Sequence, residues 1–370
     1  MTEVLPVLAA AAVVDLVDGS GAALHPEVHT GPGLSPQARA AVEAGIPDST
    51  RRAYSADFRQ FAAWCAELGR DCLPATADTV TEYIAHLIAT PRPRTGQPYS
   101  PSSLERVIAS IRTAHKAAAR TPPETKGARK ALAGYRAALS ESDDDAARRR
   151  AQPNRVNAAV PATLRRFVAA LDRTTLKGKR DAALLLLGHA IAARASELVA
   201  LNVGSVTVDP DGRGIAVAVY RKKVKRWTHP KVMYGSNPAT CPVRAVLALL
   251  EALGAEGRTD GPLFVRLDRH GHLAPPMTRH GRPIGDPEGR MTTQAAADVI
   301  ENTAAAAGAE GRYRGHSLRR GFVTAARNAG ADMVDIGRHG GWADGSKALL
   351  AYVEEDDGWG ENNPLIGIGL

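Results

Sequence analysis

Two arginine motifs in the second half of the chain have the composition of a phosphate-binding site. Arg194 opens an Arg-x-Ser-Glu-Leu motif, and a second arginine, Arg319, follows His316 by three residues. On a helix this spacing places His316 and Arg319 on one face. Guanidinium groups are permanently charged and bind phosphate oxygens through two parallel hydrogen bonds. The two arginines therefore predict a site for a phosphoryl group.

A lysine-rich turn and a late tyrosine add groups that can exchange a phosphoryl group. Lys222, Lys223 and Lys225 lie in the turn between two strand-like segments, and Tyr352 lies near the end of a short helical pattern. A tyrosine hydroxyl can attack phosphorus and form a phosphoester. A lysine held at a hairpin tip can deliver a proton to the leaving oxygen. Together the motifs predict phosphoryl transfer to a side chain.

Each of these residues also has a structural explanation when it is taken alone. Arg194 can pair with Glu197 at i,i+3, as surface arginines of helices often do. His316 can be an ordinary residue of a helix start, and Tyr352 can pack in a core beside Leu349. Four independent motifs in one order on a basic chain are much rarer by chance than any one of them. Their combination favours the catalytic interpretation.

In this order the motifs resemble those of the tyrosine recombinases, the phage integrase family, over about Ser49 to Val353. The resemblance implies a mainly α fold with a small antiparallel sheet: an N-terminal four-helix core-binding domain of SAM-like fold, then a catalytic domain. It also implies a site-specific recombinase that cleaves and rejoins duplex DNA through a 3′-phosphotyrosyl bond to Tyr352. Arg194 and Arg319 would stabilise the pentacoordinate phosphorane. The phosphotyrosyl ester conserves the bond energy for religation without ATP, and no metal or cofactor is expected.

Two catalytic positions have more than one candidate in the sequence. Relatives commonly place the catalytic lysine after a short Arg-x step, which favours Lys223 over Lys222. They also place a His or Trp nine residues before the tyrosine, whereas here Trp342 precedes Tyr352 by ten residues and His339 by thirteen. An indole N–H can donate to a phosphate oxygen as an imidazole can. Trp342 with a one-residue insertion is therefore preferred to His339.

Other classes of protein fit part of the sequence. The segment from Ala326 to Trp342, with Gly330 at a turn, is compatible with a helix-turn-helix regulator that does not catalyse a reaction. That hypothesis leaves Arg194, the lysine turn and Tyr352 unexplained. A type IB topoisomerase or a hairpin telomere resolvase would use the same chemistry as a recombinase. A catalytically inactive relative that bends DNA is disfavoured, because the catalytic positions are intact.

Helical periodicity begins at Ser49 and predicts four helices, over residues 49–68, 76–90, 100–119 and 126–139. These helices define a DNA-binding domain over residues 49–140. Cations on their polar faces are candidates for phosphate contacts. They are Arg51, Arg52, Arg106, Arg112 and Lys116.

Residues 141–158 combine an acidic run, a basic run and a proline, so they predict a linker. The catalytic domain is predicted over residues 159–353. It begins with helices over 161–171 and 179–192 and another close to Arg194. A three-stranded antiparallel meander follows, over 205–208, 215–220 and 227–233. Further helices are predicted over 242–253, 293–307, 318–328, 333–338 and 347–353, and residues 266–290 are predicted as a loop.

The distribution of charge indicates a polyanionic partner. The chain carries a net charge of +8, but residues 1–48 hold one arginine against six acids. The remaining 322 residues hold 46 Lys and Arg against 33 Asp and Glu, a net charge of +13. A body this basic attracts nucleic acid, and release of counterions adds to the attraction. Double-stranded DNA is therefore the expected partner.

The two ends of the chain differ from the basic body. Residues 1–48 are predicted to form a poorly ordered arm, and their negative charge excludes a phosphate-binding role. Residues 354–370 form a tail with five acids and no Lys or Arg. Its apolar end either docks on a neighbouring protomer, as tails in the family often do, or frays. The resemblance further implies a homotetramer on paired sites, while the target sequence, the direction of the reaction and any accessory protein stay open.

A cytoplasmic protein is expected from the apolar runs and the cysteines. The apolar run Val4–Val14 is too short for a bilayer and lacks a basic start, so neither a signal peptide nor a membrane anchor is predicted. Cys65, Cys72 and Cys241 are odd in number and lack metal-ligand spacing. They predict neither a disulfide framework nor a zinc site.

Overall fold

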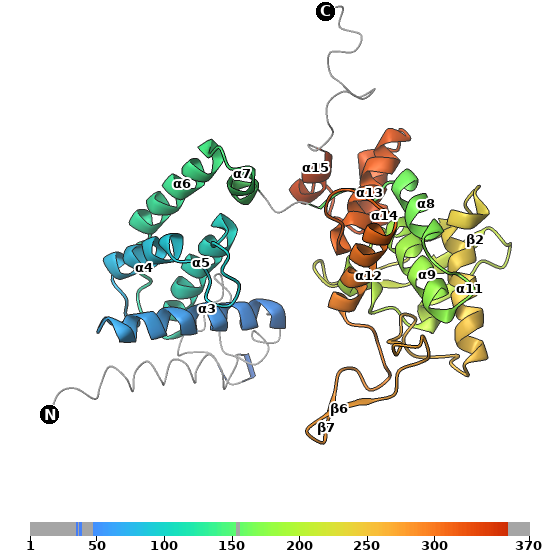
Figure 1. Cartoon of the computed structure of the whole chain (residues 1–370), viewed down its shortest axis with the longest axis horizontal. Coiled ribbons are helices and arrows are strands. Elements are labelled where there is room, and N and C mark those ends of the chain that lie inside the picture. The colour runs from blue at the N-terminus through green and yellow to red at the C-terminus, as the bar shows by residue number, and fades with distance from the viewer. Residues whose placement is uncertain (1–34, 36, 39–46, 153–155, 354–370) are drawn as a thin grey trace, which may run out of the picture. The chain divides into compact units, whose positions relative to one another are not determined.

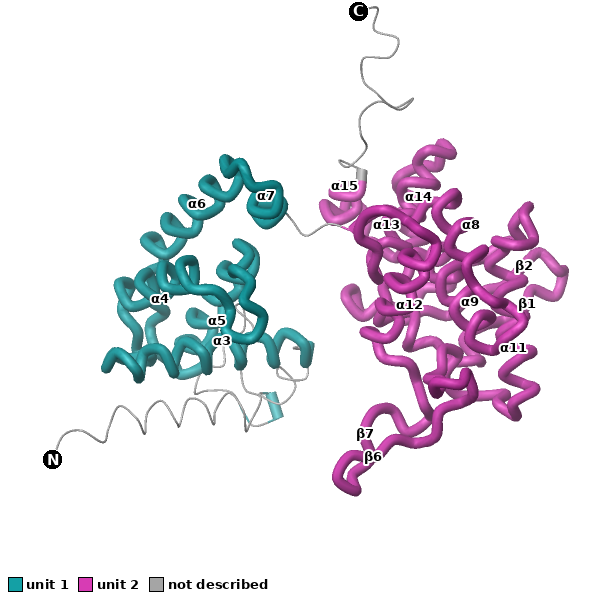
Figure 2. Tube along the Cα trace, viewed as in Figure 1, with its two compact units in different colours: residues 1–155 teal, residues 156–370 magenta. Residues whose placement is uncertain are grey.

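The computed structural model describes residues 35, 37–38, 47–152 and 156–353, and it divides the chain into two units, Met1–Arg155 and Val156–Leu370 (Figure 2). The predicted arm and tail therefore lie almost entirely outside the described residues. The described part is mainly helical with small antiparallel sheets, which confirms the predicted fold class. None of its helices has the length and apolar character needed to cross a lipid bilayer. Each unit has its own hydrophobic core.

Unit 1 contains the four predicted helices, α3 (Asp48–Glu67), α4 (Ala77–Ala89), α5 (Pro101–Ala117) and α6 (Lys126–Glu141) (Figure 1). The side chains of Thr76 and Ser100 cap α4 and α5 by accepting hydrogen bonds from backbone N–H groups three residues on. The apolar stripes bury large side chains such as Phe61 and Ile111. The 3.6-residue periodicity thus marks the faces that pack together.

His115 lies in the core of unit 1 and has a structural role. Its Nδ1 is 2.8 Å from the Ile111 carbonyl oxygen, and its Nε2 accepts a hydrogen bond of 2.8 Å from the Ala75 backbone N–H. Because Nε2 accepts, Nδ1 carries the proton and donates to Ile111. Burial lowers the pKa of the ring. The neutral imidazole therefore joins α5 to the chain before α4.

The segment predicted as a linker, 141–158, contains a short helix, α7 (Asp145–Ala151), next to the end of α6 (Figure 1). The Asp144 carboxylate caps it by accepting from the Ala146 N–H at 2.9 Å. Ala147 is buried. The acidic and basic runs that indicated a linker therefore occupy the two ends of a helix, where acids at the start and arginines at the end complement the helix dipole.

Unit 2 is built around a buried helix, α9 (Leu176–Ala190), which contains the apolar run 182–187. Further helices surround it or extend from it (Figure 1). They are α8 (Pro161–Ala169), α10 (Ala195–Leu198), α11 (Pro242–Ala255), α12 (Thr293–Ala306), α13 (Gly315–Asn328), α14 (Met333–Gly340) and α15 (Lys347–Val353). Gly321 lets α13 lie close to the start of the unit, since a Cβ there would be 2.0 Å from the Ala159 carbonyl oxygen. The predicted helices are all present, with ends shifted by a few residues.

The predicted meander is divided into two small sheets. Strands β1 (Val206–Val208), β2 (Gly214–Val217) and β5 (Lys231–Met233) form one antiparallel sheet in the order β1-β2-β5. Strands β3 (Val219–Arg221) and β4 (Arg226–Thr228) form a separate hairpin. Ala218, between β2 and β3, donates its N–H to the carbonyl of Ser205, which precedes β1. Pro230 has no N–H to donate, which breaks the third predicted strand between β4 and β5.

The loop predicted over 266–290 contains a hairpin of two short strands, β6 (Met277–Arg279) and β7 (Arg282–Ile284). The turn residues His280 and Gly281 both have positive φ, at 50° and 73°. Positive φ at both central residues is typical of a type I′ turn, which matches the twist of a hairpin. The prediction of a loop without regular structure was wrong, because a fully exposed hairpin has no buried face and so no alternation of apolar residues.

Candidate active site

Arg194 lies just before α10 and is held by the glutamate of its own motif. Its Nη1 donates to Glu197 Oε1 at 2.6 Å, and its backbone N–H donates to Glu197 Oε2 at 3.0 Å. Glu197 is fully buried, whereas 22% of the Arg194 side chain is exposed. The i,i+3 pair that explains Arg194 structurally is thus present. It also fixes one edge of the guanidinium while the side chain stays accessible.

A second arginine, Arg221, shares Glu197 from the opposite side. It is fully buried at the end of β3, and its Nη1 donates to Glu197 Oε2 at 3.0 Å. Burial raises the pKa of Glu197, but the Arg194 N–H and the two guanidiniums outweigh this effect, so the pKa lies below its ordinary value. The carboxylate is therefore charged and flanked by two cations.

Arg221 also ties the lysine hairpin to the rest of the site. Its Nη2 donates to the Ile191 carbonyl at 2.9 Å and to the His339 carbonyl at 3.3 Å. Its Nε donates to Thr228 Oγ1 at 3.0 Å across the hairpin. Arg221 was not among the residues predicted for the site. Strand alternation is the signal that could have found it, since Val219 and Arg221 face inward while Tyr220 faces out.

Arg319 lies on α13 and is fully buried. Its Nη1 donates to the carbonyls of Ala192 and Gly340, the latter at 2.9 Å. Ala192 has the unusual φ of 48°, at the turn after α9. The Nε and Nη2 groups of Arg319 have no hydrogen-bond partner within the described residues. Two buried N–H groups without a partner are costly unless a ligand accepts from them.

Trp342 stacks on this guanidinium. The Cζ of Arg319 lies 3.3 Å from the centre of the indole ring, in a cation–π contact. Burial and the charge of Arg194 lower the pKa of Arg319 to about 9. The neighbouring Gly340 makes room for the indole, because a Cβ there would lie 1.8 Å from the ring. Only glycine therefore allows the indole its place beside Arg319.

His316, one turn before Arg319 on α13, is exposed. Desolvation, followed by the charges of Arg194, Arg319 and Lys223, lowers the pKa of its imidazole. These three cations belong to α10, α13 and the β3–β4 hairpin. Their shared effect on one ring means that the fold brings the three predicted motifs together, and that the free ring is neutral near pH 7.

The lysine turn is docked on the segment that follows α14. Arg226, opposite Arg221 in the hairpin, donates from Nη2 to the Trp342 carbonyl at 3.0 Å. Lys222 and Lys223 are both exposed at the tip. Lys223 is among the charges that lower the pKa of His316. This effect supports the preference for Lys223, which stays a prediction.

Tyr352 lies on α15 beside Trp342, with the two ring centres 5.7 Å apart in an edge-to-face contact. It packs at the border of a small cluster that includes Ala192, Trp342 and Leu349. Tyr352 therefore lies near the stacked pair of Arg319 and Trp342.

His339 is placed differently from Trp342. Its ring stacks on Phe322 with centres 5.0 Å apart, and its Nε2 is 2.7 Å from the Ala190 carbonyl oxygen. Burial lowers the pKa of the ring. The arrangement gives His339 a structural bond to the end of α9, whereas Trp342 is in direct contact with Arg319.

The candidate phosphate contacts of unit 1 mostly have partners within the unit. Arg106 forms a two-point ion pair with the buried Asp57, at 2.7 and 3.0 Å. Arg112 donates to the Pro123 carbonyl at 3.0 Å, while Arg51 and Arg52 contact Asp48. Arg106 and Arg112 thus stabilise the helical bundle, whether or not they also meet DNA.

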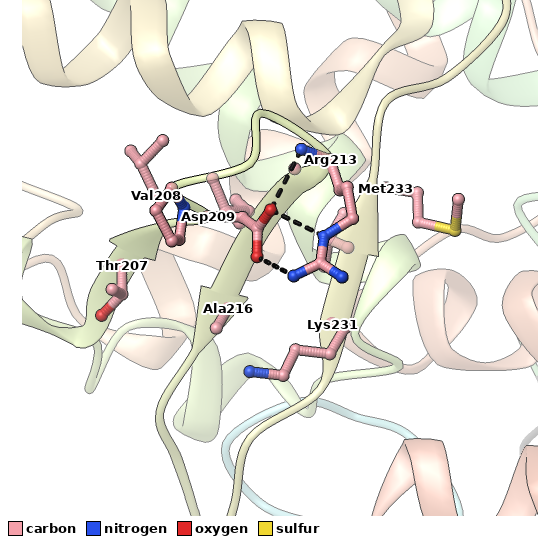
Figure 3. Close-up of a pocket in the computed structure, with 11 residues that line it drawn as sticks. Thr207, Val208, Asp209, Arg213, Ala216, Lys231 and Met233 are labelled. Carbon is pink, nitrogen blue, oxygen red and sulfur yellow. Dashed lines mark hydrogen bonds and ion pairs between the residues drawn. The ribbon is translucent and has the colours of Figure 1, made fainter.

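A cavity of about 390 Å³ lies along the sheet β1-β2-β5 and is separate from these groups. Thr207, Ala216 and Lys231 are neighbours in its lining, and Figure 3 shows the Asp209 carboxylate bonded to the Arg213 guanidinium at its edge. None of the predicted site residues lines it. The chemistry described above therefore does not involve this cavity.

Comparison with known proteins identifies several relatives. An integrase/recombinase XerD homolog of Selenomonas ruminantium is 28% identical over 343 residues, which cover 89% of this chain and 88% of that protein. The tyrosine recombinase XerD of Caulobacter vibrioides is 26% identical over 302 residues, 79% of this chain and 82% of that protein. Both comparisons extend over most of each chain.

Solved structures give weaker matches. The XerA recombinase is 14% identical with a TM-score of 0.40, covering 86% of this chain and 91% of its own. The XerH recombinase in a post-cleavage complex with its palindromic difH substrate is 14% identical with a TM-score of 0.42, covering 82% and 75%. The model of the phage integrase family matches residues 161–358, which are 198 of the 370 residues. Because that match spans more than half of the sequence, the chain belongs to the phage integrase family, the tyrosine recombinases.

Proposed function

We propose that this protein is a site-specific recombinase that cleaves and rejoins duplex DNA, with Tyr352 as the nucleophile. The observation that carries the proposal is the buried Arg319 guanidinium, which leaves two N–H groups without a partner beside Trp342 and Tyr352. A phosphate oxygen of the DNA would accept from these groups. The net charge of +13 on residues 49–370 supports duplex DNA as the substrate.

Each catalytic side chain has one role in the proposed reaction. The Tyr352 oxygen attacks phosphorus, and the bond from phosphorus to the 5′-oxygen breaks, which leaves a 3′-phosphotyrosyl ester. His316 accepts the phenolic proton, consistent with its lowered pKa. Lys223 protonates the departing 5′-oxygen. Arg194, Arg319 and the Trp342 indole stabilise the charge on the non-bridging oxygens, and the reverse steps with a new 5′-hydroxyl rejoin the strands.

The finer features of the family are part of the same proposal. We place the protein on paired DNA sites as a homotetramer, with Lys222 and His339 as the second candidates for their roles. A helix-turn-helix regulator would need α14 for base contacts. Here Ile336 of α14 is buried against the cluster next to the catalytic groups, which favours a structural role for the helix.

The test is a nicked suicide duplex containing the chromosomal or plasmid site next to the gene. The wild-type chain should form a covalent protein–DNA adduct, and mass spectrometry should place the nucleotide on the peptide that contains Tyr352. Tyr352→Phe should bind the duplex unchanged, since it removes one oxygen, and should form no adduct. An adduct on another tyrosine, or full activity of the Phe variant, would contradict the assignment. Relaxation of supercoiled DNA without strand exchange would instead indicate a topoisomerase.

A further inference from the structure

The hairpin of β6 and β7 carries exposed cations that the proposed reaction does not use. Residues 277–284 read Met-Thr-Arg-His-Gly-Arg-Pro-Ile and contain no acid. Both strands are exposed along their whole length. Figure 1 shows the hairpin extending away from the helices of unit 2. Its side chains are therefore available to a ligand.

Two arginines face each other at the tip of this hairpin. Arg279 pairs directly with Arg282 in the register, on either side of the turn. Neither has a carboxylate within ion-pair distance among the described residues. Like charges directly opposite each other destabilise a strand pair, and a two-stranded hairpin without a packed face is marginally stable. An anion bound to both guanidiniums would relieve the repulsion.

The base of the hairpin is fixed to the body of unit 2. Arg266 donates from Nη2 to the Pro275 carbonyl at 2.9 Å, on one side of the hairpin. On the other side, Arg290 donates from Nη1 to the carbonyls of Val199 and Leu201, at 3.0 and 3.1 Å. These carbonyls follow α10, whose other end carries Arg194. The base of the hairpin is thus bonded to the residues after α10, and Arg194 lies just before the same helix.

DNA that is bound at Arg194 carries phosphates on both sides of the cleavage site. A hairpin with four residues on each side of its turn centre extends by roughly 13 Å. Duplex DNA carries one phosphate charge per about 1.7 Å of its axis. A duplex therefore carries several phosphates over a length equal to that of the hairpin.

We infer that the β6–β7 hairpin is a second DNA-binding site, in which Arg279 and Arg282 bind backbone phosphates beside the cleavage site. The inference rests on the proposed function, because the ligand is the same duplex. It adds a contact that takes no part in bond cleavage. A two-stranded ribbon also fits the width of the major groove, which lets two opposed arginines meet phosphates at the groove edge.

The test measures the salt dependence of DNA binding by the full chain. The probe is a fluorescent duplex of mixed sequence, about 40 base pairs long, titrated by anisotropy between 50 and 200 mM NaCl. Loss of two phosphate contacts lowers the slope of log K against log salt by about 1.8. Affinity for DNA falls between 50 and 200 mM NaCl in both proteins. The fold-loss for the double variant Arg279→Gln with Arg282→Gln should be roughly ten times smaller than that for wild type.

Two matched variants separate a specific contact from a general effect of charge. Arg279→Lys with Arg282→Lys keeps both charges and should keep most of the wild-type slope. Arg165→Gln with Arg213→Gln removes two exposed charges elsewhere in unit 2 and should change the slope by much less than the hairpin variant. An equal change in this control, or an unchanged slope in the hairpin Gln variant, would overturn the inference.

The remaining outcomes separate this site from the catalytic one and from a protein interface. At saturating DNA the hairpin Gln variant should still form the Tyr352 adduct on the suicide duplex. A wild-type chain that binds with the expected slope but forms no adduct would contradict the proposed function and leave the hairpin contact standing. If the Gln variant alters self-association in ultracentrifugation while the slope stays as in wild type, the hairpin is a protein interface and the inference is wrong.

Discussion

Arg221 should be the residue of the site whose loss most lowers stability, and its loss should also slow cleavage. Arg221→Met keeps a long apolar stem but removes four hydrogen bonds, to Glu197, Ile191, Thr228 and the His339 carbonyl. Removing one partner of a buried ion pair costs about 3–5 kcal/mol, because the other charge stays buried without full compensation. Arg221→Met should therefore lower the free energy of unfolding of unit 2 by about 3–5 kcal/mol.

The assay is urea unfolding of the full chain, with hydrogen exchange of α9 and α13 amides to assign the loss to unit 2. Arg213→Met is the matched control, since Arg213 pairs with Asp209 on the surface and such exposed pairs contribute about 0–1 kcal/mol. Under conditions where Arg221→Met is still folded, the suicide duplex should be cleaved much more slowly, because Arg194 and the lysine hairpin lose their shared support. Equal losses of stability in the two variants, or wild-type cleavage by Arg221→Met, would refute this reasoning.

Three further predictions concern the other groups. Lys223→Ala should slow cleavage strongly while DNA binding persists. A substrate with a 5′-bridging sulfur should restore the rate, because its leaving group needs no proton. If this substrate rescues Lys222→Ala and not Lys223→Ala, Lys222 is the residue that protonates the leaving oxygen. Trp342→Ala should damage cleavage more than His339→Ala when both are assayed as folded proteins, and the reverse order would give the third phosphate contact to His339. Deletion of residues 1–48, which carry a net charge of −5, should leave duplex binding intact or slightly stronger in a filter-binding assay, so weaker binding would reveal a role for the arm.

Much of the site could be predicted from the sequence because its chemistry depends on residue types in a fixed order. The apolar stripes of α3, α4 and α5 also predicted their helices closely, since packing faces impose a 3.6-residue period. Family membership confirms the resemblance from which these predictions came. The individual roles of Lys223 and Trp342 stay predictions until the variants are measured.

What could not be predicted depends on burial or on isolated local structure. Arg221 was difficult to identify from the sequence because three exposed lysines follow it in the turn. Only its inward position in β3 distinguishes it from them. The β6–β7 hairpin has no buried face, so its sequence lacks a period of two. The helix α7 was missed because its charges indicate a solvated linker, while one small residue, Ala147, makes its packing contact.

The network around Glu197 has a consequence for handling the protein. The single carboxylate of Glu197 forms ion pairs with both Arg194 and Arg221. Arg319 adds a third positive charge, which is repelled by these two arginines. The unliganded fold therefore bears electrostatic repulsion that a bound polyanion would neutralise. By linkage, a ligand at a hundred times its Kd adds about 2.7 kcal/mol to the free energy of unfolding. Short duplexes or sulfate should thus raise the melting temperature and protect unit 2 from proteolysis during purification.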